Sequence, residues 1–143
     1  MELASQDEQL IALLRENGRV SVSEIARKMS VSRTAAQMRL QKLERQGVIE
    51  GYAVKLSSKF LKARVRALVM IKFPPIKRAE IEKQLSAIQT LTALYSISGE
   101  FDMAGMVSAA AMDELDKIID KIGCIEGIEK TMSSIILSTK IDR

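Results

Sequence analysis

The chain has 143 residues, of which 47% are apolar and 3% aromatic, so a single core or two small cores must be built from aliphatic side chains. Histidine is absent, which excludes a Ser-His or Cys-His nucleophile and removes the commonest metal ligand. The formal net charge of +4 lies wholly in residues 1–63, where eleven Lys/Arg face seven Asp/Glu, because residues 64–143 hold eleven of each. A local basic excess is typical of a nucleic-acid-binding surface, and a solvated charged face is the alternative.

Membrane, secretory and catalytic features are lacking in the sequence. No apolar run reaches the roughly 18 residues that span a bilayer, and the N-terminal MELASQDEQL has no basic region of a secretory signal. The single cysteine, Cys124, fits a reducing compartment, and its apolar surroundings predict that it is buried. We therefore expect a cytoplasmic protein without catalytic residues, metal ligands or cofactor.

The first part of the chain, residues 1–56, has the pattern of three short helices. Residues 5–8 and 21–24 both have the Ser-x-x-Glu form of a capping box, and Ser32 is the predicted cap of a third helix that Gly47 ends. Residues 48–56 look like a short extended segment. The second and third helices are joined by only a few residues, which predicts a helix-turn-helix whose second helix enters the DNA major groove.

The predicted third helix has one apolar and one polar face. At 100° per residue, Ala36, Leu40 and Leu43 fall on one narrow face and should pack inward. Threonine and glutamine can hydrogen-bond base edges, methionine can touch a thymine methyl, and lysine and arginine reach phosphates. The residues on the opposite face and its flanks are therefore predicted DNA contacts: Arg33, Thr34, Gln37, Met38, Arg39, Gln41, Lys42 and Arg45.

The second part of the chain predicts a β-α-β-β-α-β order, which is a ferredoxin-like unit. The predicted strands are residues 64–73, 92–98, 101–109 and 127–141, and the predicted helices are residues 77–88 and 112–123. Both helices cover the same face of such a sheet, so the other face, with Val69, Ile71, Ile135 or their neighbours, should be covered by a second copy. The expected fold is α+β, with a domain at 1–56, a linker at 57–63 and a domain at 64–143.

Residues 7–56 resemble the signature of the Lrp/AsnC family of transcription regulators. The matching features include Asn17-Gly18-Arg19, Glu24-Ile25-Ala26, Arg39-Leu40 and the segment Gly47-Val48-Ile49-x-Gly51-Tyr52. The resemblance implies a winged-helix-like DNA-binding domain, dimers formed by C-terminal sheets, and further assembly into tetramers, octamers or rings. It also implies a prokaryotic, nucleoid-associated protein that binds double-stranded DNA.

The resemblance adds residue roles at the DNA. Ser32, Arg33, Thr34, Gln37 and Met38 are expected at the groove, with Ser21 and Ser23 at the start of the preceding helix. Arg39, Lys42 and Arg45 are expected to serve mainly phosphates. The family usually has glycine in the turn where this chain has Ser30. If Ser30 has a positive φ, the serine costs energy that glycine would not.

The stretch SISGEFDMAGMV, residues 96–107, has two interpretations. A hairpin turn with Gly99 in an unusual φ and Glu100 at its tip is the simpler one. The stretch also matches the family's Gly-x-Phe/Tyr-Asp loop, and the resemblance implies an amino acid effector bound between dimers. The predicted effector site then comprises Gly99, Glu100, Phe101 and Asp102, with Thr131, Ser133 or Ser134 of a neighbouring chain completing it.

Two other functions fit the same sequence less well. An architectural protein that bends DNA without an effector would need the same basic helix-turn-helix units. Sirohaem decarboxylases are similar to this family, but their chemistry would call for proton-donating groups such as histidine, which this chain lacks.

Overall fold

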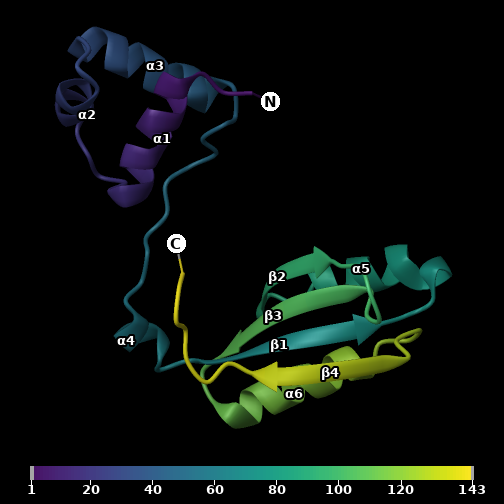
Figure 1. The fold of residues 1–143 in the computed structure, drawn as a ribbon. Coiled ribbons are helices and arrows are strands. Elements are labelled where there is room, and N and C mark those ends of the chain that lie inside the picture. The colour runs from purple at the N-terminus through teal and green to yellow at the C-terminus, as the bar shows by residue number, and fades with distance from the viewer. Residues whose placement is uncertain (1, 143) are drawn as a thin grey trace. The chain divides into compact units, whose positions relative to one another are not determined.

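The computed structural model describes residues 2–142, which divide into two compact units, Met1–Lys55 and Leu56–Arg143. Met1 and Arg143, at the outer ends of the two predicted domains, lie outside the described residues. The first unit contains three helices, α1 (Ser5–Glu16), α2 (Val22–Met29) and α3 (Arg33–Arg45), as Figure 1 shows. The predicted helix-turn-helix is thus α2 and α3, with α1 packed against them.

Serine side chains cap the two helices of the helix-turn-helix. Ser21 Oγ accepts a hydrogen bond from the Glu24 amide at 3.1 Å, and Ser32 Oγ accepts one from the Ala35 amide at 3.0 Å. Both caps were predicted and both are confirmed. The Glu24 carboxylate does not return to its cap; it accepts a 2.7 Å bond from Arg27, which lowers the pKa of Glu24.

The predicted cap at Ser5 is wrong. Ser5 is the first residue of α1, and the N-cap is Ala4, whose side chain cannot cap. The amides of Asp7 and Glu8 donate instead to the Ala4 carbonyl, at 2.8 and 3.1 Å. The Ser-x-x-Glu pattern is present, but Ser5 lies one residue after the N-cap position and so cannot cap the start of the helix.

Aliphatic side chains from all three helices form the core of the first unit. Leu10, Ile25, Ala36 and Leu43 are at most 1% exposed, and Leu40 packs against them from the edge. The inward face predicted for the third helix is therefore confirmed. Complete burial of each large side chain stabilises the unit by about 1.5–3 kcal/mol, which fixes α3 against the other two helices.

Ser30, between α2 and α3, has the left-handed conformation, with φ 55° and ψ 42°. Its amide reaches the carbonyls of Ala26 and Arg27 and so ends α2. A side chain in this conformation costs about 1–2 kcal/mol relative to glycine, which avoids the clash of Cβ with the next carbonyl. The departure from glycine in the turn is therefore a position of real backbone strain.

The segment after α3 contains no strand, although an extended segment was predicted at 48–56. Residues 50–57 have no regular secondary structure, and Tyr52 and Val54 are 56% and 84% exposed. The Tyr52 hydroxyl donates to Glu44 Oε1 of α3 at 3.0 Å. Partial desolvation, and then the neighbouring Glu44 carboxylate, raise the pKa of Tyr52, so its hydroxyl keeps the proton of this bond to a higher pH than a free tyrosine would.

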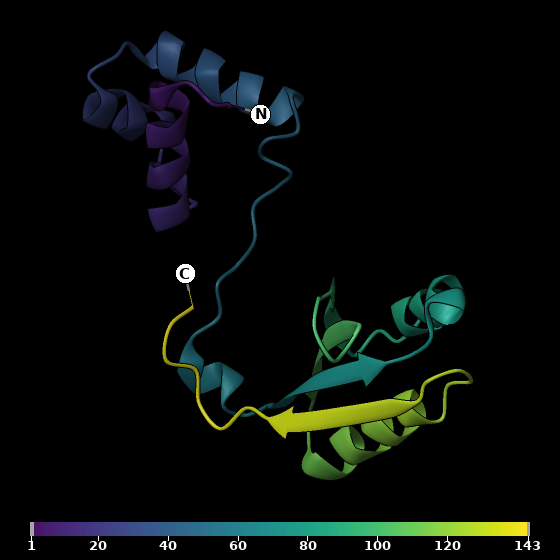
Figure 2. The same ribbon diagram turned by 45° about the vertical axis from the view of Figure 1, so that its right-hand side comes forward.

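The second unit is a four-stranded antiparallel sheet with two main helices on one face (Figures 1 and 2). Its strands are β1 (Val65–Lys72), β2 (Leu91–Ser96), β3 (Met103–Ala109) and β4 (Lys130–Ile135), in the spatial order β2-β3-β1-β4. The helices are α5 (Arg78–Ser86), preceded by the 3-10 turn Pro75–Lys77, and α6 (Met112–Gly123). The predicted βαββαβ order is confirmed, but β4 ends at Ile135 and a short helix, α4 (Ser58–Leu61), occupies the expected linker.

The prediction left open whether Val69 and Ile71 or their neighbours form the uncovered face, and the structure places the neighbours there. Val69 and Ile71 are fully buried beneath α5 and α6, in one core with Ile81, Leu85 and Leu115. Because side chains alternate along a strand, their neighbours form the open face instead. The open face includes Leu68, Met70, Ala104, Met106, Met132 and Tyr95. Ile135 pairs with Ala67, so it belongs to the helix side, where it is 37% exposed at the sheet edge.

Cys124 is exposed, so its predicted burial is wrong. The residue follows the last turn of α6, two positions after the buried Ile122. Two helical positions correspond to about 200°, which turns Cys124 to the side opposite Ile122.

Candidate DNA-binding face and effector loop

The outward face of α3 brings most of the predicted DNA contacts together. Arg33, Thr34, Gln37, Met38, Gln41, Lys42 and Arg45 are all exposed. Met38 is 64% exposed on this face. Within residues 2–142, Arg33, Lys42 and Arg45 form no ion pair. Their three charges are therefore available to an anionic partner.

The serines at the helix starts frame this face. Ser32 and Ser21 use their hydroxyl oxygens to cap α3 and α2, and Ser23 is exposed in the first turn of α2. A capping hydroxyl accepts from the backbone, so its own proton stays available to donate to a phosphate oxygen. The free amides of a helix start also favour an anion.

Arg39 lies apart from the other predicted contacts. Its Nη1 is 2.6 Å from Asp7 Oδ1, and its Nη2 donates to Gln6 Oε1 at 2.5 Å, so it joins α3 to α1. Asp7 is only 4% exposed, and the Arg39 side chain is 28% exposed. The helical spacing of 100° per residue placed Arg39 on a flank of α3. That spacing says nothing of a partner 32 residues away in the sequence.

The predicted effector residues Gly99, Glu100, Phe101 and Asp102 form the loop between β2 and β3, which is called the effector loop below. Gly99 has φ 109°, as predicted, and the amide of Ile97 donates to the Asp102 carbonyl across the loop at 3.0 Å. The Asp102 carboxylate is anchored, because its Oδ2 accepts the Phe73 amide at 3.0 Å. The Asp102 amide donates to the Ile71 carbonyl at 2.9 Å, so the loop is tied to the end of β1.

Two further contacts join the loop to β4. Lys130 Nζ is 3.3 Å from Glu100 Oε1 and lies 5.5 Å from the centre of the Phe101 ring. Phe101 is buried at 7% exposure, so its ring packs under the loop while Glu100 stays exposed. Lys130 was not among the predicted site residues, because only the fold brings the start of β4 to this loop.

The polar residues of β4 do not share one face. Thr131 and Ser133 pair with Ile71 and Val69 of β1, whereas Ser134 pairs with Leu68 and belongs to the open face. Thr131 lies at the same end of β1 as the effector loop, since Asp102 also bonds to Ile71. Thr131 and Ser133 therefore lie on the helix side of the sheet, and Ser134 lies on the open face.

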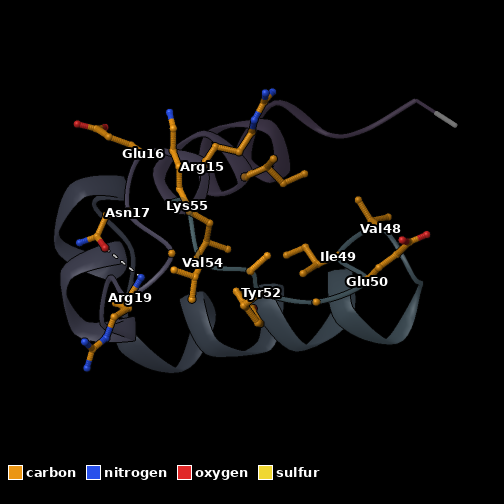
Figure 3. Close-up of a pocket in the computed structure, with 15 residues that line it drawn as sticks. Arg15, Glu16, Asn17, Arg19, Val48, Ile49, Glu50, Tyr52, Val54 and Lys55 are labelled. Atoms are coloured by element: carbon orange, nitrogen blue, oxygen red, sulfur yellow. Dashed lines mark hydrogen bonds between the residues drawn. The ribbon is translucent and has the colours of Figure 1, made fainter. Parts of the chain in front are cut away.

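A groove of about 830 Å³ lies on the first unit, between the end of α1 and the segment after α3 (Figure 3). Its apolar lining includes Ile11, Leu14, Ile49 and Val54. Charged residues also line it: Arg15, Glu16, Arg19, Glu50 and Lys55. None of the predicted DNA contacts lines this groove. It was not predicted, because its walls come from two segments, residues 11–19 and 48–55, that lie far apart in the sequence.

Residues 2–142 contain neither a cluster of metal ligands nor a membrane-spanning helix. No group of three or more Cys, Asp or Glu side chains in this range could hold a metal ion. No helix in the same range is long and apolar enough to cross a membrane.

Comparisons with known proteins match both units. The model of the AsnC-type helix-turn-helix domain matches residues 5–44, and that of the Lrp/AsnC ligand binding domain matches residues 66–143. A relative from Pyrococcus furiosus, described as an uncharacterised HTH-type transcriptional regulator, is 31% identical over 137 residues, covering 96% of this chain and 93% of its own.

Solved structures show the same fold. AsnC of Escherichia coli has a TM-score of 0.89 at 24% identity, with 100% of this chain and 97% of AsnC covered. A transcriptional regulator of Neisseria meningitidis, solved as a complex with L-Met, has a TM-score of 0.87 at 21% identity, with 99% and 94% covered. The family and these relatives are transcriptional regulators, not enzymes. The chain belongs to the Lrp/AsnC family of transcriptional regulators.

Proposed function

We propose that the outward face of α3 reads a specific DNA sequence. The observation that carries the proposal is the exposed row of Thr34, Gln37 and Met38, flanked by cations that form no ion pair within residues 2–142. The hydroxyl and amide would bond base edges, the thioether would contact thymine methyl groups, and Lys42 and Arg45 would hold phosphates. Arg39 is left out of this face, because its guanidinium already joins α3 to α1.

Removal of the phosphate contacts (the clamps, Lys42 and Arg45) and of the base contacts (the readers, Thr34 and Gln37) should have different effects. Lys42→Gln and Arg45→Gln should each weaken binding to every duplex, because one phosphate contact is lost. The negative slope of log K against log salt should become shallower by about 0.9 for each variant. Thr34→Ala and Gln37→Ala should instead change sequence preference and leave that slope unchanged. Titrations of specific and random duplexes at several salt concentrations measure both quantities. Equal loss on every duplex for all four variants would contradict the division into readers and clamps.

We propose further that the effector loop binds an amino acid. Asp102 keeps Oδ1 for an α-ammonium while Oδ2 holds the Phe73 amide, and Lys130 beside Glu100 offers a cation for the α-carboxylate. Thr131 lies at the same end of β1 but on the helix side of the sheet, so Thr131, Ser133 or Ser134 would be supplied by another copy. The L-Met complex of the Neisseria meningitidis regulator supports this class of ligand.

The effector should be detectable without knowledge of the operator. An amino acid present at about 100 times its dissociation constant should stabilise the folded chain by about 2.7 kcal/mol, because it binds only the folded state. Thermal unfolding across a panel of amino acids measures this shift. A flat panel would contradict the amino acid proposal and would favour an architectural protein without an effector.

The open face of the sheet supports a homodimer. Leu68, Met70 and Met106 form its centre, and Tyr95 and Met132 are 59% and 48% exposed within the unit. A second copy of the same face would cover these side chains by a two-fold, self-complementary contact. Tetramers or octamers, and a cytoplasmic, nucleoid-associated location, belong to the same proposal.

A further inference from the structure

A long stretch of cations without any carboxylate follows the helix-turn-helix. Residues 51–79 hold eight lysines and arginines and no aspartate or glutamate. The eight are Lys55, Lys59, Lys62, Arg64, Arg66, Lys72, Lys77 and Arg78. The positive charge of this stretch is therefore not neutralised by neighbours in the sequence.

Four of these cations gather where the second unit begins. Lys59, in α4, and Lys62, which caps its end, are exposed and three positions apart, so they lie on the same side of the helical turn. Arg64 and Arg66 follow at the entry to β1. Among the described residues, none of these four forms an ion pair.

Hydroxyl groups, rather than acids, hold the two arginines. Arg64 Nε donates to Ser108 Oγ at 2.9 Å, and Arg66 Nη2 donates to Thr139 Oγ1 at 2.6 Å. A neutral hydroxyl fixes the direction of a guanidinium and leaves its charge in place. The two side chains are thus positioned without being neutralised.

The C-terminal tail adds a fifth cation. The Ile136 amide donates to the Arg66 carbonyl at 2.9 Å, and the tail then runs beside α4 in both views (Figures 1 and 2). Lys140 follows Thr139 directly in this tail, and Asp142 is the one acid of the tail among residues 136–142. We call Lys59, Lys62, Arg64, Arg66 and Lys140 the α4 basic patch.

We propose that the α4 basic patch is a second DNA-binding surface, which holds backbone phosphates of the duplex outside the half-site that α3 contacts. The inference rests on the proposed DNA-binding face of α3. The chain from Tyr52, whose hydroxyl is bonded to α3, to Ser58, where α4 begins, can extend to roughly 20 Å at about 3.3 Å per residue, and residues 50–57 have no regular structure. That reach covers about six base pairs, along which a duplex presents one charge per about 1.7 Å.

The experiment compares two lengths of random-sequence duplex. On a long duplex, the double variant Lys59→Gln/Lys62→Gln should make the negative slope of log K against log salt shallower by between about 1 and 2 per bound chain. On a short duplex that covers only one half-site, the same variant should have the slope of the wild-type chain. An unchanged slope on the long duplex overturns the inference.

A matched control distinguishes the effect of losing charge in the α4 basic patch from the effect of losing net charge anywhere on the chain. Lys117→Gln/Lys121→Gln removes the same two charges from exposed positions of α6, where Asp116 and Asp120 are neighbours in the sequence, and it should leave both slopes unchanged. An equal fall for the control would overturn the inference, because any lost charge would then act alike. If the Lys42 and Arg45 variants make the salt slope shallower and the α4 variant does not, the result contradicts the second surface and supports the α3 face. A wild-type chain that binds neither duplex would overturn both proposals.

Discussion

Arg39→Gln is expected to destabilise the first unit by about 2–3 kcal/mol. The substitution leaves the Asp7 carboxylate, which is 4% exposed, without the guanidinium that now lies 2.6 Å away. Breaking a fully buried ion pair costs about 3–5 kcal/mol, and the 28% exposure of Arg39 reduces that figure through solvent screening. Urea unfolding of the full chain, followed by circular dichroism, measures the change.

The same substitution at Arg27 provides the control. Arg27 is 2.7 Å from Glu24, almost the distance of the Arg39–Asp7 pair, but its side chain is 71% exposed and that of Glu24 is 44% exposed. Arg27→Gln should therefore change the stability by less than about 1 kcal/mol. Equal losses for the two variants would show that burial of Asp7 contributes nothing.

The DNA titration of the Asp7→Asn variant decides between the two roles of Arg39. If Arg39 held a phosphate in competition with Asp7, removal of the Asp7 charge would free it and strengthen DNA binding. If Arg39 positions α3, Asp7→Asn should weaken binding to the specific duplex and leave the salt slope unchanged. The geometry supports the second outcome, since both hydrogen-bonding arms of Arg39 reach α1.

Asp102→Asn is expected to abolish the effector response while leaving the fold intact. The asparagine carbonyl can still accept the Phe73 amide, so the free energy of unfolding without ligand should change by less than about 1 kcal/mol. The lost charge, however, removes the partner of an α-ammonium, and the stabilisation of about 2.7 kcal/mol at 100 times the dissociation constant should disappear. Thermal unfolding with and without the stabilising amino acid measures both effects.

Alanine at the same position gives a less clear answer. Asp102→Ala would leave the amide of Phe73, a residue only 3% exposed, without its partner, at a cost of about 1–3 kcal/mol. Asp116→Asn, an exposed carboxylate of α6, is the control and should keep the full response. Full stabilisation of Asp102→Asn by the amino acid would remove Asp102 from the site and leave its bond to Phe73 as its role.

Local features of the sequence predicted local features of the structure. The caps at Ser21 and Ser32 and the inward face of α3 depend on residues a few positions apart, and all are confirmed. The βαββαβ order follows from periodicity and breakers such as Pro74-Pro75, and it is confirmed as well. The sequence raised a positive φ at Ser30 only as a condition, from the glycine usual in the turn, and the structure shows that conformation.

The features that the sequence could not predict depend on contacts that no local pattern contains. The strand at β1 is apolar on both faces, so alternation alone could not tell whether Val69 or Met70 lies beneath the helices. The partners of Arg39 and Asp102 lie 32 and 29 positions away. The charges of both residues were visible in the sequence and their intramolecular partners were not, so neither hydrogen bond could be predicted.

The hydrogen bond between Tyr52 and Glu44 gives the molecule an internal optical reporter. The chain has no tryptophan and two tyrosines, and one tyrosine lies in each unit: Tyr52 after α3 and Tyr95 on the open face of the sheet. A Tyr95→Phe chain therefore fluoresces only from the helix-turn-helix unit, with an emission that changes when the bond to Glu44 breaks. A Tyr52→Phe chain fluoresces only from the sheet, where a covering partner would change the environment of the ring. Unfolding of the first unit and burial of the open face can thus be followed separately in the full-length protein without any attached dye.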